Sequence, residues 1–207
     1  MLDAQGYFYP LVGPAREHGN PDCVLTEMEA QVERAKAMGV QPTHVDTHMG
    51  TVAHPKFMRG YLQTALKHGL PPMIFRMEAA GWMAAGLDAE TAQMAMGMTR
   101  VLEESGMPLL DHLRTLHLHL PDQRLAYARE TLSALQPGIT HFIIHPSVDT
   151  PELREITPDW RARVADYQTF MSEELRETIR SLGIQVIGYR QLQSLMPDPA
   201  ALAELPL

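Results

Sequence analysis

The segment Pro42-Thr-His-Val-Asp-Thr-His-Met-Gly50 carries the most informative pattern in this sequence. On an extended strand, side chains two and four residues apart point to the same side, so His44, Asp46 and His48 would line one face. A helix would also bring His44 and His48 together, but it would turn Asp46 away from them. Pro42 and the β-branched residues between the histidines favour the strand. We therefore expect one strand face to present two imidazoles and a carboxylate.

Two imidazoles and a carboxylate suit a borderline divalent ion such as zinc, iron, nickel or cobalt. Gly50 marks the exit from the strand into a loop, which is the end at which α/β sheets place their sites. Any one histidine alone could equally be a hydrogen-bonded core residue or a surface residue. Burying three polar groups together without a ligand or partners would cost several kcal/mol, so the string as a whole predicts a metal site.

Two further residues follow apolar runs. His145 comes directly after residues 139–144 and is followed by Pro146, so it ends a strand candidate. A histidine at the C-terminal end of a parallel strand is placed for acid–base catalysis, although it could also merely end the strand. Arg76 follows the run at 73–75 and could bind a carboxylate or a substrate oxygen, or be an ordinary surface arginine.

Helical and apolar segments alternate along the chain. Helices are predicted over residues 26–38, 55–68, 88–104, 122–135, 158–182 and 191–195. Strand candidates are residues 40–46, 73–75, 109–110, 116–120, 139–144 and 184–187, and residues 1–22 are predicted to be irregular. This alternation is typical of βαβ units and a mostly parallel sheet, that is, an α/β fold. The strand candidates are too few to close a (β/α) barrel, so either the sheet is open or strands are missing upstream.

The composition limits the classes of partner and the compartment. The chain has 207 residues, of which 45% are hydrophobic and 20% are charged, as in an ordinary globular domain. A net charge of −8 without a basic stripe argues against nucleic acid and anionic membranes as partners. Cys23 is the single cysteine, which excludes an internal disulfide framework. No secretory signal or transmembrane run is present in the sequence, and we expect a cytoplasmic protein.

The segments PTHVDTHMGT, FIIHP and GIQVIGYRQL, together with the pattern DW-x-x-R-x-x-DY, resemble the YdjC-like (ChbG-type) carbohydrate deacetylase family along nearly the whole chain. The resemblance implies a TIM-barrel-like (β/α) barrel of the glycoside hydrolase/deacetylase type. It also implies a divalent metal, Mg²⁺ or Zn²⁺, that serves the removal of N-acetyl groups from amino sugars or chito-oligosaccharides.

In the family, the last histidine of T-H-x-D-x-H binds the metal, and His48 matches it. His44 and Asp46 match the rest of the string, where they would support or complete the site. His145 matches a later histidine, which is a candidate acid or substrate contact. The resemblance thus implies a catalytic role for His145 and Asp46, metal binding by His48 and His44, and leaves Arg76 as a candidate substrate contact.

Two departures from the family pattern bear on these expectations. Met49-Gly50-Thr51 stands where many members continue with further histidines. The A-D-D-F-G-like and H-L-x-L-T-like segments of the family are absent. We therefore expect residues 1–207 to be a single domain that forms the C-terminal portion of such a barrel, and we leave open whether this chain alone is active. The expected partner is a small carbohydrate, and a homodimer is allowed for.

Two other readings stay open at this point. His44-x-Asp46 with a distal histidine imitates the facial triad of non-haem iron oxygenases, although that chemistry usually sits in an all-β barrel and long helices argue against it. Alternatively, the chain is a non-catalytic remnant that serves as a binding or structural module.

Overall fold

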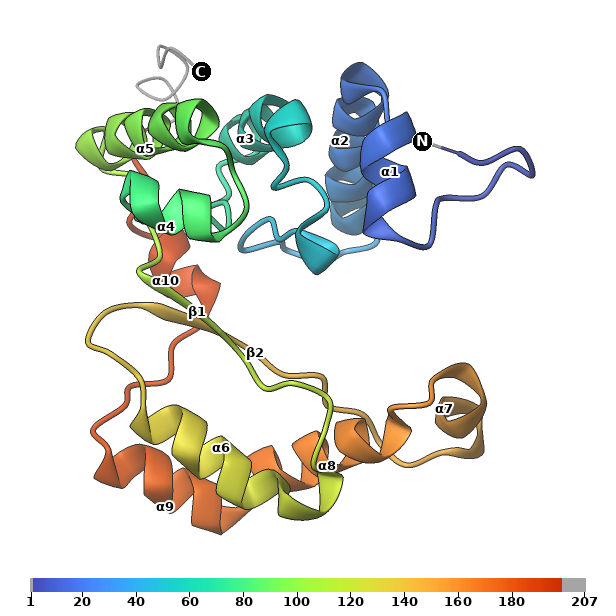
Figure 1. The fold of residues 1–207 in the computed structure, drawn as a ribbon, viewed down its shortest axis with the longest axis vertical. Helices are drawn as coiled ribbons and strands as arrows, with labels where there is room; N and C mark the ends of the chain where they lie inside the picture. The colour runs from blue at the N-terminus through green and yellow to red at the C-terminus, as the bar shows by residue number, and fades with distance from the viewer. Residues whose placement is uncertain (1, 199–207) are drawn as a thin grey trace. The chain divides into compact units, whose positions relative to one another are not determined.

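The computed structural model of the chain describes residues 2–198. They fall into two compact units. The first comprises residues 2–109 together with residues 188–198, and the second comprises Leu110–Ile187. Both units are built mainly from helices (Figure 1). The single domain expected over residues 1–207 stays a prediction, and each unit is described by itself below.

Helices dominate the first unit. They are α1 (Val12–His18), α2 (Pro21–Ala37), α3 (Pro55–Lys67), α4 (Ala79–Ala84), α5 (Ala89–Glu104) and α10 (Tyr189–Gln193), with a short 3-10 turn, η1 (His48–Gly50). The core combines one face of α3, one face of α5 and the segments that follow these helices. Its buried members are Tyr61, Leu62, Ile74, Leu102, Met107 and Leu109.

The helices predicted at 55–68 and 88–104 are confirmed as α3 and α5, and their first turns are capped as their sequences indicate. Pro55 occupies the first turn of α3, and the Nδ1 of the preceding His54 accepts a hydrogen bond from the Lys56 amide at 3.2 Å. Asp88 precedes α5 and accepts from the Thr91 amide at 2.9 Å. Side-chain acceptors of this kind satisfy amides that have no partner within the helix.

The prediction for the N-terminal region was wrong in two respects. Residues 1–22 are not irregular throughout, because α1 lies within them. The next helix begins five residues before the expected Thr26, at Pro21, since the Asn20 side chain accepts from the amides of Asp22 at 2.9 Å and Cys23 at 3.1 Å. Thr26 lies inside α2, where its hydroxyl donates to the Asp22 carbonyl. An asparagine cap followed by proline is the stronger start signal.

The segment at 40–46 is extended but is not a full strand. A single parallel bridge joins Val45 to Pro72, with the Val45 amide donating to the Pro71 carbonyl at 3.2 Å. The Tyr61 hydroxyl donates to the Val45 carbonyl at 2.6 Å and accepts from the Met73 amide at 2.9 Å. The Met73 amide also donates directly to the Val45 carbonyl at 3.2 Å, and the pairing extends no further, so the strands expected at 40–46 and 73–75 are reduced to one bridge.

The second unit contains the parallel sheet. Its elements are β1 (His112–Thr115), η2 (Pro121–Gln123), α6 (Arg124–Ser133), β2 (Thr140–Ile143), α7 (Pro151–Ile156), α8 (Trp160–Met171) and α9 (Glu173–Ser181). β1 and β2 run in parallel, with His112 opposite Thr140 and Thr115 opposite Ile143, and α6 forms the connection between them. Figure 1 shows α6, α8 and α9 grouped together, and their mutual packing covers a core of Leu116, Ala128, Leu132 and Leu175.

The mixed α/β class is confirmed, with a small parallel sheet in place of the several strands expected. β2 confirms the strand predicted at 139–144. Its partner β1 lies between the candidates at 109–110 and 116–120, neither of which is a strand in the described chain. Residues 184–187 form no strand in the described chain either, and Val186 is 77% exposed. An apolar run becomes a strand only where a neighbour offers backbone groups for pairing.

The helix predicted over 158–182 is two helices. Ser172 has an extended backbone (φ −76°, ψ 145°) that ends α8, and its hydroxyl accepts from the Leu175 amide at 3.2 Å to start α9. Within residues 2–198, no helix combines the length and the apolar character that crossing a bilayer would require.

Candidate functional site

His44 lies on the extended segment and packs against the C-terminal helix of its unit. Its imidazole is stacked on the ring of Tyr189, the first residue of α10, with the ring centroids 3.9 Å apart and the planes inclined by 5°. Its Nδ1 is 3.3 Å from the Thr43 hydroxyl. His44 is therefore half-buried and held in one orientation by an aromatic contact.

Asp46 and His48 are exposed. The Asp46 carboxylate accepts from the amide of Thr47, the next residue. Burial, and after it the charge of Asp46, raises the pKa of the Tyr189 phenol well above its usual range. Burial is also the main cause that raises the pKa of Tyr61, with a smaller contribution from Asp46. Asp46 thus lies close to two phenols that stay protonated at neutral pH.

The backbone is strained directly after His48. Met49 has φ 53° and ψ 21°, a left-handed conformation that non-glycine residues seldom adopt. The buried Thr47 stabilises this turn, since its hydroxyl accepts from the Val52 amide at 3.0 Å. Such strain persists only where surrounding contacts enforce it, and it is found at functional sites more often than elsewhere.

These residues have the right donor chemistry for a divalent ion. The imidazole of His48 and the carboxylate of Asp46 are open to solvent, and the carboxylate keeps further lone pairs to offer. Within residues 2–198, however, no three His, Cys, Asp or Glu side chains are gathered into a group that could hold a metal. The metal role of His48 and His44 stays a prediction that rests on their types and spacing.

Arg76 is engaged with the protein itself. Its Nε donates to the Glu103 carboxylate on α5 at 2.6 Å, and the two side chains are 46% and 44% exposed. The carboxylate that this guanidinium binds in the structure is therefore an intramolecular one. Its role in substrate binding stays a prediction.

His145 belongs to the second unit and lies where the sequence predicts, two residues after the end of β2. Its backbone amide donates to the Oδ2 of Asp166 on α8 at 2.9 Å. Its Nδ1 is buried and has no hydrogen-bond partner in the described chain. The imidazole is thus oriented by its backbone and its packing, with no bond to Nδ1 that would fix the tautomer.

The interpretation of the sequence missed the importance of Asp166 and of its partner Arg124. The Nε of Arg124 donates to the Oδ1 of Asp166 at 2.6 Å, and the two side chains are 2% and 0% exposed. One signal could have pointed to Asp166. It shares a helix face with Ala162 and Thr169, at spacings of four and three residues, and all three are buried. A carboxylate on a core-facing position requires a charged or hydrogen-bonding partner.

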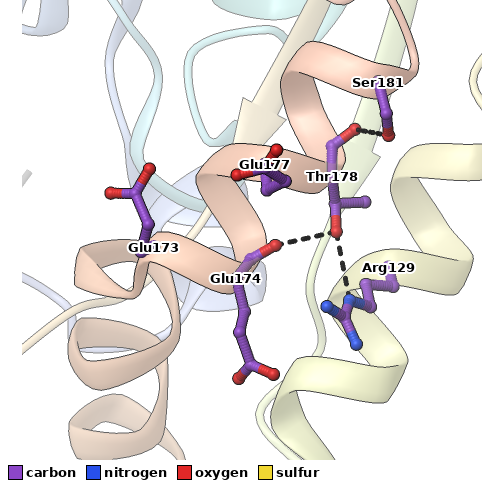
Figure 2. Close-up of a pocket in the computed structure, with 6 residues that line it drawn as sticks. All are labelled: Arg129, Glu173, Glu174, Glu177, Thr178 and Ser181. Atoms are coloured by element: carbon purple, nitrogen blue, oxygen red, sulfur yellow. Dashed lines mark hydrogen bonds between the residues drawn. The ribbon is translucent and has the colours of Figure 1, made fainter.

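A surface hollow of about 320 Å³ lies between α6 and α9 (Figure 2). Arg129 donates to the Thr178 hydroxyl at 3.1 Å across it, and the rest of the lining is three glutamates and Ser181. Glu173 is already paired with Arg176 and Arg180. None of the predicted site residues lines this hollow. Exposed ion pairs of this kind are ordinary on the solvent-facing side of a helix, so the hollow is not taken as the functional site.

Comparison with known proteins places these observations in a family. The family model described as "YdjC-like protein" matches residues 1–181. A carbohydrate deacetylase from Thermus thermophilus is 29% identical over 180 residues, which are 86% of this chain and 64% of that protein. A carbohydrate deacetylase from Thermoanaerobacter pseudethanolicus is 21% identical over 193 residues, 93% of this chain and 69% of that protein.

The fold has a counterpart among solved structures. A crystal structure from Enterococcus faecalis, of a protein named for a proposed cellobiose-phosphate cleavage activity, superposes with a TM-score of 0.70 at 19% identity. The match covers 92% of this chain and 68% of that one. This chain therefore spans less than two thirds of the length of the Thermus relative and about two thirds of the other two.

Proposed function

Because the chain belongs to the YdjC-like protein family, we propose that it is a carbohydrate deacetylase, which hydrolyses the N-acetyl group of an amino sugar or chito-oligosaccharide. The observation that carries the proposal is the family match over residues 1–181, since this range contains both the segment from His44 to His48 and His145. The similarity to two carbohydrate deacetylases supports it. A small neutral carbohydrate is also compatible with a net charge of −8.

Amide hydrolysis sets two requirements on the protein. A water molecule must be activated, and the nitrogen must be protonated before it leaves, because an amide anion is a very poor leaving group. We assign the second task to His145, whose imidazole can donate a proton to the amine as the tetrahedral intermediate collapses. A proton donor in this position typically contributes a rate factor of about 10² to 10⁴.

We further propose that the reaction depends on a divalent metal, Mg²⁺ or Zn²⁺, for which His48 is a ligand. When bound, such an ion supplies a water of lowered pKa and polarises the acetyl carbonyl. His44 would support His48, with its ring held by Tyr189. Asp46 would either bind the ion or orient a ligand. Arg76 is a candidate contact for a sugar oxygen, for which it would have to leave Glu103.

The parallel pair of β1 and β2, connected through α6, supports the further proposal of a TIM-barrel-like arrangement of the deacetylase type. The same architecture disfavours the oxygenase reading, because that chemistry usually occupies an all-β barrel and this chain is mostly helical.

The experiment is to incubate the chain with diacetylchitobiose and Mg²⁺ or Zn²⁺ and to follow the products by NMR. We expect acetate and a free amine in equal amounts, with the glycosidic bond intact, and loss of both products when a chelator is added. Cleavage of the glycosidic bond, or no acetate from any N-acetylated sugar with either metal, would contradict the proposal. The second result, in a fully folded chain, would favour a non-catalytic binding module.

A further inference from the structure

The most unusual feature of the second unit is the buried ion pair between Arg124 and Asp166. Removing two charges from water is costly, and an apolar pair of similar volume often stabilises a protein as well or better. Here each charged group makes more than one hydrogen bond. Beside its bond to Asp166, the Arg124 guanidinium donates to three backbone carbonyls, those of Leu116 (3.2 Å), His117 (2.5 Å) and His119 (2.9 Å).

The groups held by this pair come from two places in the chain. The three carbonyls belong to the segment directly after β1, whereas the amide that donates to Asp166 is that of His145, just after β2. Because β1 and β2 are parallel neighbours, both segments leave the same edge of the sheet. The ion pair therefore ties two strand ends together at the carboxyl edge, where α/β proteins place their sites.

Two further details concern the backbone at this edge of the sheet. Leu120 has φ 51° and ψ 54°, a left-handed conformation that a non-glycine residue keeps only when its surroundings impose it. Leu120 directly follows His119, whose carbonyl accepts from Arg124. In addition, the Nδ1 of His145 is buried and has no partner in the described chain, so no bond at that atom orients the ring. The hydrogen bond from the His145 amide to Asp166 holds the backbone that carries the ring.

We propose that Asp166 and Arg124 are positioning residues, whose buried ion pair fixes the backbone of His145 and so aims its imidazole at the substrate. This inference rests on the deacetylase function proposed above, in which His145 donates the proton. Asp166 acts through one carboxylate oxygen on His145, and Arg124 acts by holding the other. An error of a fraction of an ångström in the position of a proton donor weakens catalysis more than binding.

The test must separate positioning from folding. Asp166→Asn leaves Arg124 without its counter-charge and gives one of two donors no acceptor, so it can unfold the chain. The decisive variant is therefore the double substitution Arg124→Met with Asp166→Leu, which leaves no unpaired charge in the core, so that the only groups to lose a partner are uncharged backbone carbonyls and the His145 amide. The matched control is Arg163→Met with Asp159→Leu, because this pair joins α8 to the residue before it, has a bond of the same 2.6 Å length and makes no contact with the His145 amide.

For the folded double variant we expect a kcat about tenfold to a hundredfold lower, with KM within about twofold of the parent. NMR should show faster amide exchange at His145 and altered imidazole signals, whereas the control pair should change neither kcat nor these signals. A folded double variant with the parent's kcat, amide protection and imidazole signals would overturn the inference.

Failure of the proposed function is distinguishable from failure of this inference. If the parent chain releases no acetate, the deacetylase proposal fails, and the NMR measurements alone decide the matter. Altered exchange and imidazole signals at His145 in the double variant would then support positioning by the ion pair. Unchanged signals would overturn it.

Discussion

The ring of Tyr189 lies flat on the imidazole of His44, with the ring centroids 3.9 Å apart and the planes inclined by 5°. These residues are far apart in the sequence, yet their stacking joins α10 to the extended segment that carries Asp46 and His48. Asp46 also acts on the Tyr189 phenol, whose pKa it helps to raise. Helix α10 is thus part of the surroundings of the predicted metal-binding segment.

This stack should contribute measurably to stability. We expect Tyr189→Leu to lower the free energy of unfolding by about 1 kcal/mol beyond the loss of buried area, because aromatic pairs contribute about 0.5 to 1.5 kcal/mol. Tyr189→Phe keeps the ring and should cost less than Tyr189→Leu. Urea unfolding followed by circular dichroism measures both. Equal losses for the two variants would show that the stack is not what stabilises this contact.

Losing one partner of the buried ion pair should lower the free energy of unfolding much more than losing one partner of an exposed ion pair. Asp166→Ala leaves Arg124 buried without a counter-charge and should destabilise the chain by about 3 to 5 kcal/mol. Glu173→Ala removes the exposed partner of Arg176, a pair with the same 2.6 Å separation, and should cost less than about 1 kcal/mol. Denaturant unfolding of both variants is the measurement. Similar losses at the two sites would contradict the burial of the first pair.

His68 makes the stability of the first unit depend on pH. Burial, followed by the positive charge of Lys36, lowers the pKa of this imidazole below its ordinary value of 6.5, and its side chain is 5% exposed. Its Nδ1 lies 2.8 Å from the Lys36 ammonium and 3.4 Å from a Glu33 oxygen. The lowered pKa favours a neutral ring that accepts from Lys36, with the opposing effect of Glu33 being smaller.

A lowered histidine pKa in the folded state means that the unfolded chain takes up its proton first as pH falls. The contribution of His68 is therefore fully present above pH 6.5 and is lost as pH falls through the folded-state pKa. We expect His68→Gln to reduce the drop in urea midpoint between about pH 8 and about pH 5. His18→Gln, at an exposed position, is the control. An unchanged drop in the His68 variant would contradict the assignment.

The corrected start of α2 can be tested directly. Asn20→Ala removes the acceptor for the amides of Asp22 and Cys23 and should cost about 1 kcal/mol of stability. Thr26→Ala removes only a hydroxyl that bonds backward within the helix and should change stability by less than about 0.5 kcal/mol. Thermal unfolding of the two variants ranks them. The reverse order would restore Thr26 as the start of the helix.

The features that could be predicted from the sequence were those encoded locally. Pro55 and Asp88 start α3 and α5 through contacts within their own first turns, so the pattern around each was sufficient. The Asn20–Pro21 cap is equally local and was overlooked. Strands were harder to predict, because β1 contains His112 and Arg114 and has no apolar alternation. It is a strand only because β2 lies beside it, and that pairing is not visible in the segment itself.

The residues of the candidate site also divide into those that a local pattern predicts and those that depend on tertiary packing. His145 was placed correctly at the end of β2, because an apolar run followed by His-Pro is a local signal. The contact between Arg124 and Asp166 joins residues 42 positions apart and depends on how α6 and α8 pack. Likewise, the shared spacing of His44, Asp46 and His48 did not reveal that His44 would be half-buried under Tyr189 while the other two remain exposed. Residue type and spacing gave the chemistry, and tertiary packing decided the exposure.

The central claim is that His145 is the proton donor of a deacetylase, and one comparison tests it most directly. The rate of acetate release from diacetylchitobiose should be measured for His145→Gln and for His141→Gln, a histidine within β2 itself. We expect kcat to fall about a hundredfold in the first variant and to stay within about twofold of the parent in the second. Equal rates in the two variants, or a parent chain that releases no acetate, would contradict the claim.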